Sequence, residues 1–300
     1  ASQGYRSVGP AFTLVEAADL GRDQKTYDIW LPSVGVSYRF SDMFQSYMSY
    51  GRSHIRPYSY VPIINLYNAN RPAFQGAGIS LADLFDGYDI ETSDNVELGL
   101  RVTHDTFDIT STVFYSRHKH LLTTVYDPRV QLNYQQNIGD AVGYGLEVEG
   151  NVYLSDAFSL FINPSFMKLT YEDDLTFQGS TLDTKNNQVV DTPEWTVKAG
   201  AVWKYKDFEV VPLLRYMGKR YGDAEHKERV SDYFVTDLNI GYVFDKLSWA
   251  ETVRLSLNLY NLFDKKYVSI INASDDTRGG NASYFVGAPF TAVVGVSVEF

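Results

Sequence analysis

The sequence lacks several features that identify common classes of protein. It has no cysteine, which excludes disulfide bonds, cysteine-ligated zinc sites and thiol catalysis. It has no basic excess: the formal net charge is -11, and a nucleic-acid partner needs a basic face for its phosphates. No apolar run is long enough for a transmembrane helix, and the mean hydropathy is -0.23. Membrane crossing by strands stays open, because alternating strands give only a weak hydropathy signal.

Aromatic residues and strict alternation are what the sequence has instead. Aromatic residues make up 15% of the chain, with 23 Tyr and 18 Phe. In the segment 290–300 the even positions are aromatic or aliphatic, whereas most of the odd positions are small or polar. A period of two predicts a strand with one apolar face and one mainly polar face. Such a strand fits a barrel whose outer face meets lipid and whose inner face meets water.

Eleven segments are predicted to be strands, and all but one follow this alternating pattern; residues 43–55 are rich in Tyr and Met and their two faces are ambiguous. They lie near residues 33–40, 43–55, 96–103, 107–120, 144–152, 158–166, 194–205, 208–216, 234–244, 253–260 and 290–300.

The connections between these segments alternate strictly between short and long. The short ones are residues 41–42, 104–105, 155–156, 206–207 and 245–251, and the long ones are 56–90, 122–136, 172–188, 222–231 and 272–282. Bacterial outer-membrane barrels have short periplasmic turns and long extracellular loops. The sequence therefore predicts an all-β fold, a transmembrane antiparallel meander β-barrel with eleven strands in this chain.

Three local expectations accompany this fold. Pro164 and Pro212 fall inside predicted strands, and because each removes a ladder hydrogen bond we expect bulges or shorter strands there. Residues 80–85 predict one short helix capped by Ser80, inside the longest loop. Residues 1–25 are expected to be a loop that leads into the first strand.

Several motifs together resemble a known family. The chain contains Asn261-Leu262-Phe263-Asp264 with Tyr267, then Gly287-Ala288-Pro289 and a terminal Phe300. With the segments 97–101, 145–149 and 192–195, these motifs resemble the C-terminal part of TonB-dependent outer-membrane receptors, over most of the chain. The resemblance implies a 22-stranded barrel closed by an N-terminal plug.

The resemblance also implies a function and a set of partners. It implies an active-transport receptor in the outer membrane of a Gram-negative bacterium that imports a ferric siderophore or a similar scarce nutrient. The partners would be outer-membrane lipid, a small-molecule ligand such as an iron chelate, TonB with its inner-membrane energising complex, and the barrel-assembly machinery. Phe300 would be the signal that this machinery reads. No nucleic acid, catalytic residue or metal site is predicted, and the protein is not expected to be an enzyme.

The parity of the strands predicts that part of the barrel lies elsewhere. If Phe300 ends a strand on the periplasmic side, eleven alternating strands place residue 1 outside the cell. Bacterial single-chain barrels have even strand numbers. We therefore expect residues 1–300 to be the second half of a 22-stranded barrel, without the plug and the first strands.

Candidate ligand-binding residues lie in the longest loop and at the end of the fourth predicted strand. Tyrosine and arginine in the loop suit a bulky ligand, and two histidines at i and i+2 are expected to share a strand face as a haem or metal ligand pair. Loop packing and a polar lumen are the alternatives. The candidates are Tyr58, Tyr60, Tyr67, Arg71, His118 and His120.

The loop charges predict something about the ligand. Residues 172–191 carry five acidic side chains and one lysine, and residues 56–92 carry four acidic side chains and two arginines. Because like charges lower the local concentration of a ligand, we expect a neutral or cationic iron chelate rather than ferric citrate. The alternatives to an importer are a passive outer-membrane pore, an outer-membrane hydrolase barrel and a soluble β-sandwich.

Overall fold

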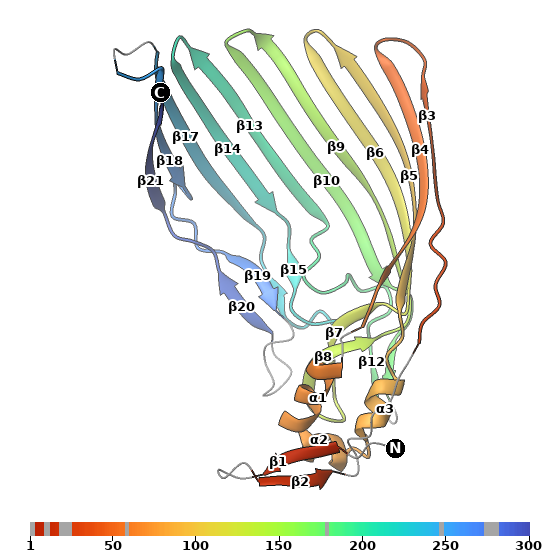
Figure 1. Ribbon diagram of the computed structural model, residues 1–300. Coiled ribbons are helices and arrows are strands. Elements are labelled where there is room, and N and C mark those ends of the chain that lie inside the picture. Colours follow the sequence, from red (N-terminus) through yellow and green to blue (C-terminus); the bar gives the residue numbers. More distant parts are fainter. Residues whose placement is uncertain are drawn as a thin grey trace.

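The protein is a curved eleven-stranded antiparallel sheet with ordered loops at one end (Figure 1). The computed structural model describes residues 4–8, 13–17, 26–57, 60–177, 180–245, 249–272 and 282–300. The sheet has the order β21-β18-β17-β14-β13-β10-β9-β6-β5-β4-β3, and every neighbouring pair is antiparallel. Its strands are β3 (Ser33–Arg39), β4 (Phe44–Ile55), β5 (Glu91–His104), β6 (Phe107–Lys119), β9 (Ala141–Ser155), β10 (Phe158–Tyr171), β13 (Trp195–Tyr205), β14 (Phe208–Met217), β17 (Tyr233–Asp245), β18 (Thr252–Tyr260) and β21 (Thr291–Glu299).

These are the eleven strands that the sequence predicts, in a meander in which each strand pairs with its predecessor and successor in the sheet. Short turns lie at one end of the sheet, and the long loops lie at the other (Figure 1). The predicted alternation of connections is therefore confirmed. Of the helices that the structure describes, none has the length and apolar character needed to cross a membrane.

The loops contain secondary structure of their own. Three helices occupy the first long loop, and five small two-stranded sheets lie outside the main sheet in the described parts of the chain. These elements are α1 (Tyr60–Ala69), α2 (Arg71–Gly76), α3 (Leu81–Asp86), β1 (Gly4–Val8), β2 (Thr13–Ala17), β7 (Leu122–Asp127), β8 (Leu132–Asn137), β11 (Leu175–Phe177), β12 (Ser180–Leu182), β15 (Arg220–Tyr221), β16 (Arg229–Val230), β19 (Val268–Asn272) and β20 (Ser283–Val286).

Several loop predictions need correction. The predicted helix with Ser80 as its cap is confirmed as α3, but α1, α2 and the β7–β8 hairpin were not predicted. The segment 1–25, expected to be a loop, contains the paired strands β1 and β2. In the described part of the chain these two short strands pair with each other, outside the main sheet.

The expectation of bulges or shorter strands at the two prolines is wrong. β10 continues through Pro164 to Tyr171, and β14 continues through Pro212 to Met217. At each proline the pairing is interrupted with one neighbour only. The β10–β9 register is the same on both sides of the gap, as is the β13–β14 register. The ladder with the other neighbour is continuous and includes Pro164 opposite Val197 and Pro212 opposite Leu238, so one missing N–H is tolerated.

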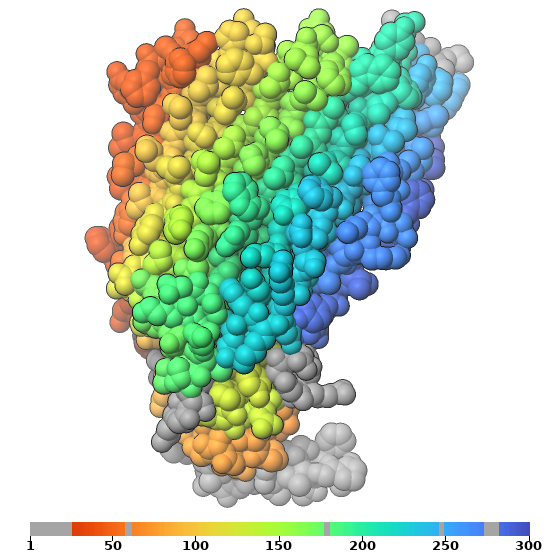
Figure 2. Space-filling model, turned by 180° about the vertical axis from the view of Figure 1, so that it is seen from behind, coloured from red at the N-terminus to blue at the C-terminus, as the bar shows by residue number. Residues whose placement is uncertain are grey.

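The register produces an apolar outer face, as predicted. One row of directly opposed residues crosses six strands. These apolar side chains are half-buried or exposed, so they are not part of a packed protein core. An exposed apolar row of this kind is typical of a barrel surface that faces lipid. Figure 2 shows the strands running obliquely across a continuous surface. The row consists of Met48, Leu98, Val113, Leu146, Phe166 and Trp195.

The inner face is mainly polar, but it carries aromatic rings folded over glycines. Tyr47 lies opposite Gly99, and its hydroxyl forms a 2.6 Å hydrogen bond with Thr112 Oγ1 on the next strand. A Cβ at Gly99 would come within 2.1 Å of the Tyr47 ring. Phe161 lies over Gly200 in the same way. These glycines are needed because the ring occupies the space of a side chain.

The motif near residue 261 fixes the connection between β18 and β21. Asn261 has a left-handed backbone with φ 48° and is 3% exposed. Its side-chain amide donates to the carbonyls of Lys265 and Ala288, while its backbone N–H donates to Asp237 at 2.8 Å. The ring of Tyr267 covers Gly287, where a Cβ would come within 2.0 Å. The residues of this motif therefore have a structural role in holding the last loop against the sheet.

We predict that Gly200→Ala destabilises the barrel. The added Cβ would lie 2.6 Å from the Phe161 ring and 2.7 Å from the backbone oxygen of Pro212, which cannot move without breaking the ladder. Thermal unfolding of the full-length receptor in detergent should occur at a lower temperature. Gly241→Ala is the matched control, because its nearest contact is at 4.0 Å. Equal unfolding temperatures for the two variants would contradict the steric argument.

Candidate ligand-binding site in the loops

The three helices of the first long loop and the β7–β8 hairpin form one packed unit, here called the loop module. Its residues belong to α1–α3, the segment to Tyr88, and the hairpin 122–137. They share a hydrophobic core in which Phe74 is 0% exposed and stacks on Tyr67 with ring centroids 5.5 Å apart. Tyr134 of the hairpin packs edge-on against Phe74 at 5.7 Å. The loop module therefore has a hydrophobic core of its own.

A capping box sets the start of α3. The Ser80 hydroxyl accepts a hydrogen bond from the Asp83 backbone N–H, and the Asp83 carboxylate accepts from the Ser80 backbone N–H at 2.8 Å. This reciprocal pair satisfies two backbone donors that a helix start leaves open. The Ser80 hydroxyl and backbone N–H hold the pKa of Asp83 below its usual value. Asp83 is thus a fixed negative charge at the N-terminus of α3.

A buried carboxylate organises the hairpin. Asp127 is 0% exposed and accepts from Arg129 Nε at 3.0 Å, from Arg129 Nη2 at 2.7 Å and from the Tyr134 hydroxyl at 2.8 Å. Burial, and then the neighbouring Asp127, raise the pKa of Tyr134 above its usual value. Bonding to Asp127 likewise raises the pKa of Arg129. The Arg129 charge is therefore neutralised by Asp127.

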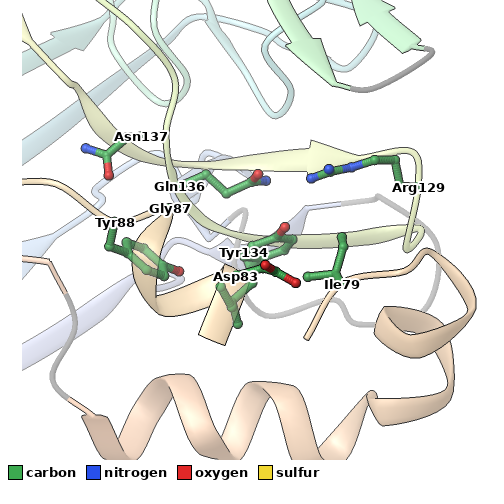
Figure 3. A pocket seen from close by; sticks show the side chains of 9 residues that line it. Ile79, Asp83, Gly87, Tyr88, Arg129, Tyr134, Gln136 and Asn137 are labelled. Atoms are coloured by element: carbon green, nitrogen blue, oxygen red, sulfur yellow. The ribbon is translucent and has the colours of Figure 1, made fainter. Parts of the chain in front are cut away.

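A pocket lies between α3 and the hairpin (Figure 3). Its volume is about 250 Å³, with Ile79, Leu84 and Tyr88 as apolar lining. The polar lining comes from Asp83 on the helix side and from Arg129, Tyr134, Gln136 and Asn137 on the hairpin side.

The chemistry of the pocket suits recognition by hydrogen bonds and aromatic contact rather than direct metal coordination. In the described parts of the chain no group of three or more His, Asp or Glu residues is placed to hold a metal ion. Asp83 adds a negative charge, and the paired Arg129 does not offset it. Apolar walls with a few convergent polar groups are typical of small-molecule sites.

The candidate loop residues differ in their burial and in their contacts. Tyr67 is 1% exposed inside the loop module core, which supports the packing alternative for this residue. The guanidinium of Arg71 lies over the Tyr67 ring at 5.3 Å and donates to Asn68 at 2.7 Å. Tyr60 begins α1, although its side chain lies outside the described residues, as does Tyr58. A ligand-binding role for these residues stays a prediction.

The expectation that the two histidines share a strand face is wrong. His118 lies in β6, where Nδ1 is 3.0 Å from Oε1 of the buried Glu91. His120 lies beyond the strand with φ 54° and is 3.8 Å from Asp89. The left-handed turn at His120 breaks the alternation that the prediction assumed. His118 instead anchors the base of the hairpin, because Glu91 also accepts the Leu122 N–H at 2.8 Å.

Many loop carboxylates are engaged within the protein. Asp191 pairs with the buried Arg220 at 2.7 Å, and Glu172 lies 3.3 Å from Arg117. Asp174 accepts the backbone N–H groups of Thr184 and Lys185. Counting charges in the sequence therefore overstates the free negative charge of the loops.

Sequence reasoning missed the pocket residues of the hairpin. One local signal was present: Asp127-Pro128 is a turn-forming pair between alternating segments, which is typical of a hairpin. The approach of this hairpin to α3 joins residues about fifty positions apart, and no sequence pattern indicates it.

We predict that Asp127→Ala loosens the hairpin. Removing the carboxylate leaves Arg129 and the buried Tyr134 hydroxyl without their partner, so the local free energy of unfolding should fall by about 2–3 kcal/mol. Hydrogen exchange of the amides in β7 and β8 measures this in the full-length receptor. Asp105→Ala, in an exposed turn at the other end of the sheet, is the control. Unchanged protection in Asp127→Ala would contradict the proposed role.

Comparisons with known proteins agree with the fold. The family model described as "TonB dependent receptor-like, beta-barrel" matches residues 4–262. The ferric enterobactin receptor of Pseudomonas aeruginosa is 23% identical over 289 residues, which cover 87% of this chain and 35% of the receptor. The ferrienterobactin receptor of Escherichia coli K12 is 25% identical over 281 residues, which cover 86% of this chain and 35% of the receptor.

A solved structure shows the same architecture. The ferric yersiniabactin uptake receptor FyuA from Yersinia pestis superposes with a TM-score of 0.63 and 18% identity, over 90% of this chain and 37% of that one. The chain spans about a third of the length of the relatives it matches. These relatives are all named as receptors, and none is named as an enzyme. The chain belongs to the TonB-dependent receptor family, and the match lies in the β-barrel of that family.

Proposed function

We propose that this chain is part of an outer-membrane receptor of a Gram-negative bacterium that imports a ferric siderophore or a similar scarce nutrient, with energy supplied through TonB and its inner-membrane complex. The family match over residues 4–262 carries the proposal. The packed loop module at the loop-bearing end of the sheet supports it, because a receptor that captures a ligand from outside needs ordered binding surface there.

The whole receptor contains more than this sheet. In the described residues β3 and β21 each pair on one side only, and a sheet edge exposed to lipid leaves backbone groups unsatisfied. We place residues 1–300 in the second half of a 22-stranded barrel whose remaining strands and plug come from the rest of the receptor. Contact with the barrel-assembly machinery through Phe300, whose side chain is 87% exposed, is part of the same proposal.

The pocket of the loop module is the proposed contact surface for the chelate. Its tyrosines and amides suit a bulky ligand with many oxygen atoms. Asp83 is the charge that the pocket does not neutralise, and a strongly anionic complex would meet repulsion there. We therefore propose a neutral or cationic ferric chelate as the cargo.

The orientation in the membrane is testable by surface labelling. Asn68→Cys, in the loop module, should react with a membrane-impermeant maleimide on intact cells that make the full-length receptor. Asp207→Cys, in the short turn between β13 and β14, should react only after the outer membrane has been permeabilised. Residues 1–300 contain no cysteine of their own, and labelling of the receptor without an introduced cysteine gives the background. The reverse labelling pattern would rule out the proposed orientation.

The charge preference is testable by binding measurements on the full-length receptor. We expect a neutral hydroxamate chelate of iron to bind more tightly than ferric citrate or ferric enterobactin, which are anionic. Asp83→Asn keeps the shape of the capping side chain and removes its charge, so binding of the anionic chelates should strengthen by about threefold to tenfold.

Asp86→Asn is the matched control, because it removes a charge from the same helix but not from the pocket. The charge proposal fails if ferric citrate binds more tightly than the neutral chelate and Asp83→Asn leaves both affinities unchanged. If no ferric chelate of any charge binds the wild-type receptor, the import function itself is contradicted.

A further inference from the structure

A second polar pocket lies at the loop-bearing end of the sheet, away from the loop module. Its volume is about 200 Å³, and it lies between the end of β10, the segment before β13 and the loop that follows β14. The side chains that matter for its chemistry are Lys168, Thr170, Glu194, Lys219, Tyr221 and His226.

The register places Lys168 of this pocket on the lipid side of the sheet. Lys168 lies directly opposite Tyr144, which lies opposite Tyr115 on the next strand. Both tyrosines belong to the outer face and are 47% exposed. Trp195, which is 48% exposed, lies opposite Phe166, two residues before Lys168 and nearer the middle of β10. Aromatic residues of this kind mark the level of lipid headgroups, so Lys168 stands at the headgroup level.

Two cations of this pocket form no ion pair in the described part of the chain. Among the residues that the structure describes, neither Lys168 nor Lys219 takes part in an ion pair or a side-chain hydrogen bond. Two arginines on the outer face at this end are paired. Arg52 donates twice to Asp94 at 2.9 Å, and Arg117 contacts Asp140 and Glu172. Lys168 and Lys219 differ from these two arginines in having no ion pair among the described residues.

The walls of the pocket are held in place by contacts that do not use the lysines. The rings of Tyr221 and His226 stack with centroids 3.6 Å apart, and His226 Nε2 donates to the Gln188 carbonyl at 2.8 Å. Lys219 lies 5.9 Å from the Tyr221 ring, which limits where its ammonium group can go. Glu194 is the one carboxylate of the lining, so the pocket keeps a net positive charge.

We propose that this pocket binds the phosphate group of an anionic lipid in the outer leaflet, with Lys168 and Lys219 as its counter-charges. A basic side chain close to an anionic lipid surface is attracted to it, and the position beside the aromatic belt brings a headgroup, rather than a dissolved ion, to the lysines. The inference rests on the proposed outer-membrane location but not on the proposed cargo.

The test uses the full-length receptor in phosphatidylcholine vesicles that contain a trace of spin-labelled phosphatidic acid or spin-labelled phosphatidylcholine. Electron paramagnetic resonance measures how strongly each labelled lipid associates with the receptor. We expect the wild-type receptor to prefer phosphatidic acid over phosphatidylcholine. In the double variant K168Q/K219Q the ratio of the two association constants should fall by about fivefold for each lysine removed.

The double variant K227Q/K266Q is the matched control, since it removes the same charge from two exposed lysines that already pair with Glu225 and Asp264. An equal loss in both double variants would show a general charge effect and overturn the proposal, as would a wild-type receptor without preference. Displacement of the labelled lipid by inorganic phosphate would show a site for a free anion and overturn the lipid assignment. Chelate binding is measured on the same samples, so that a failure of the proposed cargo can be told apart from a failure of the proposed lipid site.

Discussion

The antiparallel hydrogen-bond ladder from β3 to β21 is the constraint on which the rest of the structure depends. In lipid there is no water to satisfy the backbone, so each strand must pair along its length with both neighbours. The ladder fixes the register, and a slip by one residue would turn every apolar side chain inward. It also explains why both prolines are tolerated. Each proline is paired on one side, so the interruption costs one local contact and leaves the register unchanged.

The two ends of the sheet are built according to different physical rules. At the end with short turns the connections contain few residues and little core. At the other end the loops bury apolar side chains in two clusters and satisfy buried charges with specific partners. Asp127 with Arg129, and Asp191 with Arg220, are the pairs that fix the loops. A surface ordered in this way can recognise a ligand without first paying a large entropy cost of ordering.

The distribution of charge around the loops follows from pairing rather than from composition. The loops are acidic in sequence, yet Asp191, Glu172 and Asp174 have partners within the protein. Two pockets contain charges without an ion pair among the described residues: Asp83, which is hydrogen-bonded only to Ser80, in the loop module, and Lys168 and Lys219 in the pocket beside β10. Opposite charges on the two sides of one rim are compatible with a cargo and a lipid that bind separately.

The strands and their two faces were determined by the sequence itself, because a period of two over eight or more residues has one physical solution in a membrane barrel. The short capped helix α3 was likewise predictable, because Ser80 and Asp83 satisfy its first turn locally. The tertiary structure decided the pocket, because residues near 83 and 134 meet only when the loop module packs. It also decided where Tyr67 and the two histidines lie. Tyr67 is buried against Phe74, and the left-handed backbone at His120 separates the two histidines; both depend on neighbours that no local pattern specifies.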